Sequence, residues 1–194
     1  RETQSKVNLD SMQGIFPTTT KFGMAALLPH SSMDLVEKTN GTIGVLVDGM
    51  STDAGYRDKI LKNANESSVA LKYDNIIGLK RADRQELVKG MDVVYIYHDK
   101  IDEASHTADS AVFPACDDAI DEIKNLVRII VNEFGGTKIY ITADHGFLYT
   151  YNPLTENDKV DSSGFAKSAT EYGRRYVITE KDAETDYLLP VKMT

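Results

Sequence analysis

The sequence predicts an α/β fold whose sheet is mostly parallel and carries helices on both faces. Three short segments are apolar along most of their length, as are strands buried on both faces of a parallel sheet. Segments with the composition of helices separate these strands, and this alternation is the pattern of parallel α/β folds. A length of 194 residues suits one ordinary domain, so we expect a single domain over residues 1–194.

The first third of the chain supplies a short helix, a strand and a second helix. Residues 16–30, FPTTTKFGMAALLPH, place a threonine triplet before a glycine and a run of good helix formers. This pattern predicts a loop and then a short helix with a threonine near its N-cap. Residues 41–50, GTIGVLVDGM, predict a buried strand that ends in a turn. A helix is expected over roughly 53–64, with Ser51 or Thr52 as its cap.

The middle of the chain supplies the second buried strand and the longest helix. Residues 71–79, LKYDNIIGL, read as a short strand, and residues 81–90, RADRQELVKG, as a helix stopped by its final glycine. Residues 92–98, DVVYIYH, predict the second apolar strand. Apolar residues recur at helical spacing from about 110 to 134, which predicts a long helix there.

Two further strands are predicted near the end of the chain. The ends of the buried strands define the edge of the sheet where a site is expected. Residues 138–142, KIYIT, read as the third buried strand, and residues 174–180, RRYVITE, as an edge strand. Ligands in such sheets bind beyond the carboxyl ends of the parallel strands. The polar residues expected at or just past these ends are Asp48, His98, Asp102, His106, Asp144 and His145.

Composition and charge narrow the class of protein. The chain is 41% hydrophobic and 27% charged, as globular domains are, and its apolar runs are too short to cross a bilayer. A net charge of −8 argues against a nonspecific nucleic-acid scaffold, but it permits phosphorylated substrates when divalent metals supply positive charge. The single cysteine, Cys116, excludes an internal disulfide and a multi-cysteine zinc site, which favours a cytoplasmic protein.

Two pairs of residues have the types and spacing of metal ligands. Asp144 and His145 are adjacent at a predicted strand end, and Gly146 permits a tight bend after them. The pair suits a metal ion, but taken alone it is weak evidence, because the cap of a turn is the favoured alternative. Asp102 and His106 lie four positions apart, so one helical turn would point both side chains the same way. A solvated loop is the alternative for this second pair.

Considered together, the histidines favour a metal site. Three of the four, His98, His106 and His145, lie at the same predicted edge, each within four residues of an aspartate. Imidazole and carboxylate together are ligands that Zn²⁺ and Mn²⁺ accept. Two such clusters on neighbouring strands would hold two ions about 4 Å apart, an arrangement that suits phosphoryl chemistry. For His98 the alternative is a histidine satisfied by hydrogen bonds within the fold.

A nucleophile for such chemistry is predicted in the threonine triplet. A hydroxyl at the start of a helix lies where backbone N–H groups point outward, which suits phosphate, and metal coordination activates it for attack. Thr20 is the candidate for this role. On spacing alone, a purely structural N-cap role stays open for each of Thr18, Thr19 and Thr20.

Three motifs in this order, FPTTTKFGMAALLPH, VVYIYHDKID and ITADHGFLY, resemble the PglZ domain, a family of the alkaline phosphatase superfamily known from BREX bacteriophage-resistance systems. The likeness covers most of residues 16–151, the motif-bearing core. It implies an alkaline-phosphatase-like fold, a metal-dependent phosphatase or phosphodiesterase, and other phage-defence proteins as partners. The superfamily's aspartate before the nucleophile and its later metal-binding histidine have no counterpart here. We therefore expect a fragment that is incomplete at both ends.

The resemblance also implies roles for individual residues. Thr20 matches the metal-bound nucleophile, and Asp144 and His145 match the ligands of one ion. Asp102 and His106 resemble the ligands of the second ion, although the position of His106 varies within the family. Both ions are expected to be zinc, with manganese as the alternative.

Two residues are assigned to the phosphoester substrate. Lys21 follows the nucleophile and is expected to contact a phosphate oxygen, with a solvated lysine at the helix start as the alternative. His98 is the second expected substrate contact. Asp48 follows Thr20, in the wrong order for the missing strand-end aspartate, so we interpret it as a turn or supporting residue.

Two functions of different classes stay open. One is metal-dependent hydrolysis of a phosphoester, and the other is a non-catalytic scaffold within a multi-protein defence complex. A sulfatase is disfavoured because no cysteine lies near Thr20, and a mutase because 194 residues leave little room for a cap domain.

Overall fold

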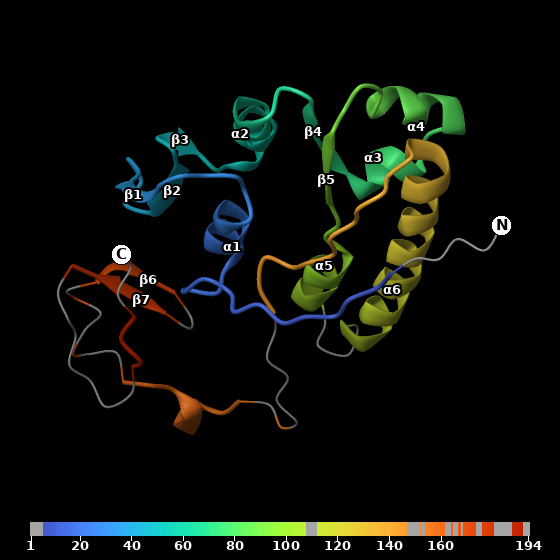
Figure 1. The fold of residues 1–194 in the computed structure, drawn as a ribbon. Coiled ribbons are helices and arrows are strands. Elements are labelled where there is room, and N and C mark those ends of the chain that lie inside the picture. The colour runs from blue at the N-terminus through green and yellow to red at the C-terminus, as the bar shows by residue number, and fades with distance from the viewer. Residues whose placement is uncertain are drawn as a thin grey trace. The chain divides into compact units, whose positions relative to one another are not determined.

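A computed structural model describes residues 6–107, 112–146, 152, 154–161, 164, 167, 169–173, 176–180 and 188–191, without the side chains of 105–107. The chain divides into two compact units, which are described separately (Figure 1). The first unit comprises Arg1–Thr52 and Ala143–Thr194, and the second comprises Asp53–Thr142. Each of the predicted site residues can therefore be assigned to one unit.

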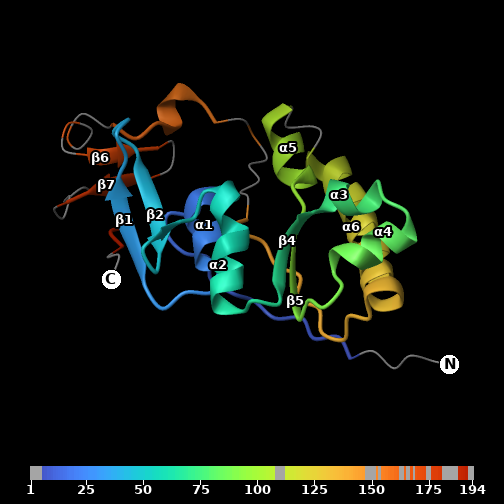
Figure 2. The same ribbon diagram turned by 90° about the horizontal axis from the view of Figure 1, so that it is seen from above.

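The first unit is built around a buried central strand. Helix α1 (Thr20–Ala26) precedes an antiparallel sheet in the order β1 (Met33–Glu37), β2 (Ile43–Val47) and β3 (Met50–Ser51). Strand β2 is buried along almost its whole length, whereas β1 is largely exposed and forms an edge (Figure 2). The core of this unit consists of side chains from α1, the residues after it and β2: Phe22, Ala25, Leu28, Ile43, Val45 and Val47.

The later part of the first unit contributes a small hairpin. Strands β6 (Ala169–Tyr172) and β7 (Val177–Thr179) pair antiparallel, with a bulge between Ala169 and Glu171. A short 3₁₀ turn, η4 (Glu156–Asp158), precedes the hairpin and is closed by a capping box between Thr155 and Asp158. The prediction of a strand within 174–180 is confirmed by β7.

The second unit contains the parallel pair of strands and most of the helices. Strands β4 (Ser68–Lys72) and β5 (Val93–Tyr97) pair in parallel from Ser68 opposite Val93 to Lys72 opposite Tyr97. The helical elements are η1 (Ala54–Tyr56), α2 (Arg57–Ala64), α3 (Tyr73–Ile77), α4 (Arg81–Leu87), α5 (Lys100–Thr107), α6 (Val112–Ile129) and the π-helical turn η3 (Ile130–Phe134). Gly135 ends the last of these in the left-handed conformation, with φ of 72°.

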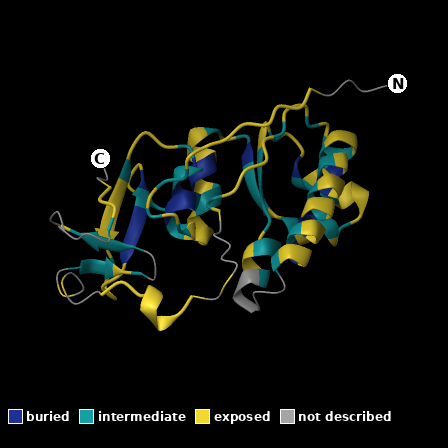
Figure 3. Ribbon diagram, turned by 90° about the horizontal axis from the view of Figure 1, so that it is seen from below, coloured by how far each residue is buried: buried dark blue, intermediate teal, exposed yellow. Residues whose placement is uncertain are grey.

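Helices α2, α3 and α6 of this unit carry buried residues. Buried residues include Ile60 and Leu61 of α2, Ile76 of α3, and Ala119 and Leu126 of α6 (Figure 3). The spacing of the α6 residues follows the helical period, which is why the long helix could be predicted from sequence. Among the described residues, no helix is both long and apolar enough to cross a bilayer.

The expectation of a mostly parallel sheet is not confirmed. The strands form three small sheets, and β4–β5 is the parallel pair among the described strands. Strand β2 is buried as predicted, but it pairs antiparallel with β1 because residues 38–42 are too few for a parallel crossover. The turn spans residues 38–41 and is closed by a hydrogen bond from the Gly41 amide to the Lys38 carbonyl at 2.8 Å, and Gly41, at φ of 77°, leads the chain into β2.

The prediction of a third buried strand at 138–142 is wrong. The segment lies outside every described strand, and Tyr140 and Ile141 are 78% and 65% exposed. Its β-branched and aromatic residues give it strand propensity, but a strand also needs a partner backbone. Among the described residues, no strand pairs with this segment.

Candidate functional site

Thr20 is the first helical residue of α1, and its hydroxyl points at His145. Thr19 is the extended N-cap of the helix, with φ of −131° and ψ of 156°, and makes no side-chain cap hydrogen bond. Thr20 is therefore placed in the helix rather than at its cap. Its Oγ1 lies 3.1 Å from Nε2 of His145, a residue 125 positions later in the chain.

Gly23 brings the helix against the backbone of Asp144. A Cβ atom at position 23 would lie 2.0 Å from the Asp144 carbonyl oxygen, so only glycine fits this approach. Residues three apart share one face of a helix, so the face that carries Thr20 is the face that packs on residues 144–145. This role is not among the sequence-based predictions, although a glycine inside a short helix is itself a sign of close packing.

The hydrogen bonds of His145 determine which of its ring nitrogens carries the proton and which can accept a hydrogen bond or bind a metal ion. Nδ1 lies 2.9 Å from the carbonyl oxygen of Gly146, which only accepts, so Nδ1 carries the proton. In the neutral ring, Nε2 then presents its lone pair toward the Thr20 hydroxyl. Oδ2 of Asp144 lies 3.5 Å from the same Nε2, and both side chains are mostly buried, 18% and 19% exposed. Two acceptor atoms therefore face each other beside one hydroxyl.

This donor set fits a divalent cation. Zinc binds imidazole nitrogen and carboxylate oxygen at about 2.0–2.1 Å in a tetrahedron, which places neighbouring ligand atoms roughly 3.4 Å apart. The separations of 3.1 and 3.5 Å around Nε2 are close to that spacing. Within the parts of the chain that are described, no group of three or more His, Cys, Asp or Glu residues gathers at one point. Asp144 and His145 could supply two side-chain ligands to such an ion, with the Thr20 hydroxyl as a third donor.

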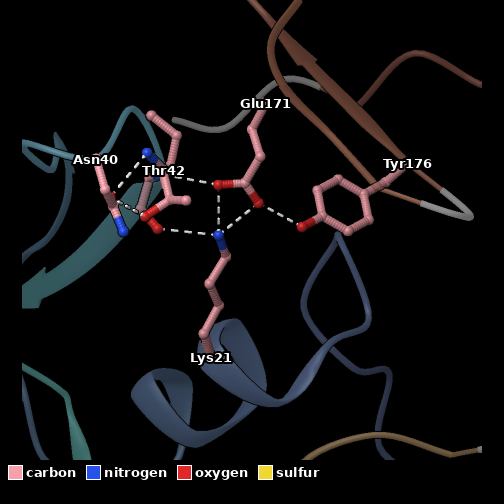
Figure 4. A network of polar contacts seen from close by, with 6 residues as sticks. Lys21, Asn40, Thr42, Glu171 and Tyr176 are labelled. Atoms are coloured by element: carbon pink, nitrogen blue, oxygen red, sulfur yellow. Dashed lines mark hydrogen bonds and ion pairs between the residues drawn. The ribbon is translucent and has the colours of Figure 1, made fainter.

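Lys21 is held within the first unit by an acidic network (Figure 4). Its ammonium donates to the Ile43 carbonyl at 2.9 Å and to both carboxylate oxygens of Glu171 at 2.5 and 2.6 Å. Glu171 also accepts from the Ile43 amide at 2.7 Å and from the Tyr176 hydroxyl. Glu171 and Tyr176 could not be predicted from the sequence, because the polar segment after residue 151 has no period that distinguishes them.

Burial and hydrogen bonding act in opposite directions on Glu171. Burial raises the pKa of its carboxyl, but hydrogen bonds from Lys21, Tyr176 and the Ile43 amide outweigh that effect and hold the pKa below its usual value. Burial and the hydrogen bond to Glu171 raise the pKa of Tyr176 to about 12. At neutral pH Glu171 is therefore a carboxylate and Tyr176 a neutral phenol.

The other predicted site residues lie in the second unit. His98, just after β5, places Nε2 2.7 Å from a carboxylate oxygen of Glu122, and the other oxygen of Glu122 accepts from Lys100. The ring of Tyr73 meets the His98 ring edge-on at 4.8 Å. Asp102 and His106 both belong to α5, as the expectation of a helical turn requires. Asp102 is exposed, and the side chain of His106 lies outside the described residues.

Asp48 holds a turn in the first unit. It adopts a left-handed φ of 47° after β2, and its carboxylate accepts from the backbone amides of Ser31 and Ser32. These backbone hydrogen bonds hold the pKa of the Asp48 carboxyl below its usual value. The geometry agrees with a turn role for this residue.

Comparisons with known proteins place this chain in a family. The family described as the BREX system PglZ alkaline phosphatase-like domain matches residues 1–194, across both units. The alkaline phosphatase-like protein BrxZ of Escherichia coli O9:H4 (strain HS) is 35% identical over 96% of this chain and 21% of its own length. The alkaline phosphatase-like protein PglZ of Bacillus cereus (strain H3081.97) is 31% identical over 93% of this chain and 21% of its own length.

The chain spans about a fifth of the length of these two curated relatives. No solved structure matches it.

Proposed function

Because the chain belongs to the PglZ family of alkaline phosphatase-like domains, we propose that it is the metal-dependent phosphoesterase domain of a BREX phage-defence protein. The observation that carries this proposal is the 3.1 Å approach of the Thr20 hydroxyl to Nε2 of His145, with the Asp144 carboxylate beside it. A hydroxyl, an imidazole and a carboxylate that meet at one point are the parts of a metal-activated nucleophile. Other proteins of the same defence system are its expected partners.

Asp144, His145 and the Thr20 hydroxyl would hold one ion in this proposal. Asp102 and His106 would hold a second, as the family pattern implies. The ions are expected to be zinc or manganese, and the ion beside Thr20 would stabilise negative charge on the attacking oxygen.

The chain's own contribution is a nucleophile in a fixed position. In the first step, a bond forms between Thr20 Oγ1 and phosphorus, the bond to the leaving oxygen breaks, and the hydroxyl proton is released to water. In the second step, a water molecule displaces Thr20 from phosphorus and restores its hydroxyl. Gly146 and Gly23 serve this chemistry by fixing the imidazole tautomer and the approach of helix α1.

Removal of the Thr20 hydroxyl tests the proposal. Thr20→Ala should lower the turnover of bis(4-nitrophenyl) phosphate with Zn²⁺ or Mn²⁺ by about 10³-fold or more, as loss of a nucleophile does. Zinc affinity by calorimetry should fall by less than about tenfold, because two of the three donors remain. The matched control is Thr18→Ala, which removes an exposed hydroxyl two positions earlier and should leave both measurements unchanged.

Two results would contradict this reading in different ways. Turnover retained in Thr20→Ala would exclude Thr20 as the nucleophile. Zinc binding without turnover in the unaltered chain would instead support a non-catalytic interaction module with the phosphatase fold.

A further inference from the structure

The ammonium of Lys21 has no donor left for a phosphate. A lysine ammonium carries three N–H bonds. Its three acceptors are the Ile43 carbonyl and the two oxygens of the Glu171 carboxylate, at 2.9, 2.5 and 2.6 Å (Figure 4). Contact with a substrate would require one of these bonds to break. Lys21 therefore belongs to the framework of the first unit.

Glu171 receives hydrogen bonds from three elements of that framework. Lys21 comes from α1, the Ile43 amide from β2, and the Tyr176 hydroxyl from just before β7. The Glu171 side chain is 12% exposed, so its charge needs these partners to offset the loss of water. Charge-assisted hydrogen bonds of this kind are stronger and more directional than neutral ones.

The bulge in β6 determines where Glu171 points. The pairing between β6 and β7 shifts between Ala169 and Glu171, so two residues oppose one there. A bulge re-aims the side chains that follow it, because it breaks the strict alternation of faces. The irregularity in this hairpin thus lies directly before the residue that reaches back to α1.

Helix α1 depends on such anchors for its position. It is seven residues long and has no side-chain cap, and isolated helices of that length are unstable in water. The contact of Gly23 with Asp144 holds one side of the helix, and Lys21 is the polar anchor in its first turn. Lys21 directly follows Thr20, so a change at this anchor changes the direction of the Thr20 hydroxyl.

We propose that Glu171 is a positioning residue that holds the first turn of α1 through Lys21, so that the side chain at position 20 faces His145. The catalytic meaning of this arrangement rests on the proposed function of Thr20, but the arrangement itself can be measured without turnover.

A thiol at position 20 measures the arrangement directly. In a Cys116→Ser background, which removes the only native cysteine, Thr20→Cys places a thiol where the hydroxyl faces His145. A thiol at this position can pass its proton to Nε2 of His145 and pair with the imidazolium, so it ionises at lower pH than an exposed thiol, whose pKa is about 8.5. The Asp144 carboxylate, 3.5 Å from the same nitrogen, stabilises the imidazolium and repels the thiolate. The pH dependence of its alkylation by iodoacetamide, with EDTA present, should therefore have its midpoint at least about one pH unit below that of Thr18→Cys.

Adding Glu171→Gln tests the positioning role. The midpoint for the thiol at position 20 should move back to that of Thr18→Cys, and its alkylation rate at pH 6.5 should fall about tenfold, since thiolate fraction falls tenfold per pKa unit. Glu156→Gln, which removes the acid of an exposed pair with Lys159 in the same unit, should leave the midpoint unchanged. An unchanged midpoint in Glu171→Gln, or an ordinary midpoint in Thr20→Cys alone, would overturn the proposal.

A milder variant covers the case in which Glu171→Gln unfolds. Tyr176→Phe removes one hydrogen bond to Glu171 and keeps the ion pair with Lys21. It should move the midpoint in the same direction by a smaller amount, and no movement would overturn the proposal. Because the thiol carries no phosphatase activity, an enzyme without turnover but with the expected midpoints would reject the proposed function and keep the positioning role.

Discussion

His145 and His98 lie in different units, and the structure gives their rings different surroundings. Nε2 of His98 faces Glu122, a carboxylate that Lys100 also binds, and Tyr73 packs edge-on against the ring. Nε2 of His145 faces the Thr20 hydroxyl and the Asp144 carboxylate, while Nδ1 is held by a backbone carbonyl. The first histidine joins a strand end to a helix, whereas the second presents a lone pair to a small polar site. Partners, rather than position after an apolar segment, distinguish a structural histidine from a candidate ligand.

Gly23→Ala should disrupt the surroundings of His145 and give the largest effect. The added methyl would lie 2.0 Å from the Asp144 carbonyl oxygen, so helix α1 and residues 144–145 must separate. Overpacking of this kind costs about 1–3 kcal/mol of unfolding free energy, and the loss of the Thr20 approach should weaken zinc binding as well. Gly55→Ala is the matched control, because a Cβ there meets no atom within 4 Å. Urea unfolding and calorimetry would measure both effects, and equal results for the two variants would refute the close approach.

Alanine at each histidine should separate the two roles. His98→Ala removes the hydrogen bond to Glu122 and the contact with Tyr73, and it should lower the unfolding free energy by about 2 kcal/mol. Its zinc affinity should stay within about twofold of the unaltered chain, since its nitrogen already has a carboxylate partner. His145→Ala should show the reverse pattern, with stability changed by about 0.5 kcal/mol and zinc affinity reduced at least tenfold. Zinc binding lost in His98→Ala would show that the comparison assigns the two histidines wrongly.

Acid should weaken the contacts of Glu122 on the His98 side, and this is the smallest expected effect. The hydrogen bond from Lys100 outweighs burial and holds the pKa of the Glu122 carboxyl below its usual value of 4.5. A carboxyl with a depressed folded-state pKa stabilises the fold above its unfolded-state pKa, and the contribution is lost as pH falls through the folded-state value. The unfolding free energy should therefore decline below about pH 4.5, and Glu122→Gln should be less stable than the unaltered chain at pH 7 with a gap that narrows in acid.

Urea unfolding across that pH range would measure the gap. Glu86→Gln, in an exposed pair with Lys89, is the matched control and should differ little from the unaltered chain at any pH. A gap for Glu122→Gln that stays constant down to pH 3 would contradict the assignment.

Local elements could be predicted from the sequence because their signals are local. The helical period of residues 112–129, the apolar strands at 43–47 and 93–97, and the glycine that ends the long helix all depend on neighbours in the chain. The direction of strand pairing could not be read in the same way. It depends on the partner of each strand, and the turn at residues 38–41 sets that partner for β2. Residues 138–142 have strand propensity without a described partner, so propensity alone misled.

Some residues of the candidate site could likewise be predicted from local signals, and others could not. The sequence predicts a site at Thr20, Asp144 and His145 because their residue types suit one chemistry. The structure brings Thr20 next to His145. Their roles in metal binding and catalysis stay predictions. Gly23 and Glu171 support the same helix, but a glycine and a glutamate have no distinctive type or spacing in a sequence. Their importance comes from contacts with residues far away in the chain.

The residues in these contacts are far apart in the chain, and this separation affects the order in which the chain can fold during synthesis. The hydroxyl of Thr20 meets a histidine 125 positions later, and the ammonium of Lys21 meets a carboxylate 150 positions later. A growing chain emerges from the ribosome in order, so helix α1 is made well before either of these partners exists. Closing such long loops costs entropy before any contact is gained. Thr20 is therefore synthesised before the residues that fix its position. Any shortened chain that stops before Glu171 lacks the proposed anchor of helix α1.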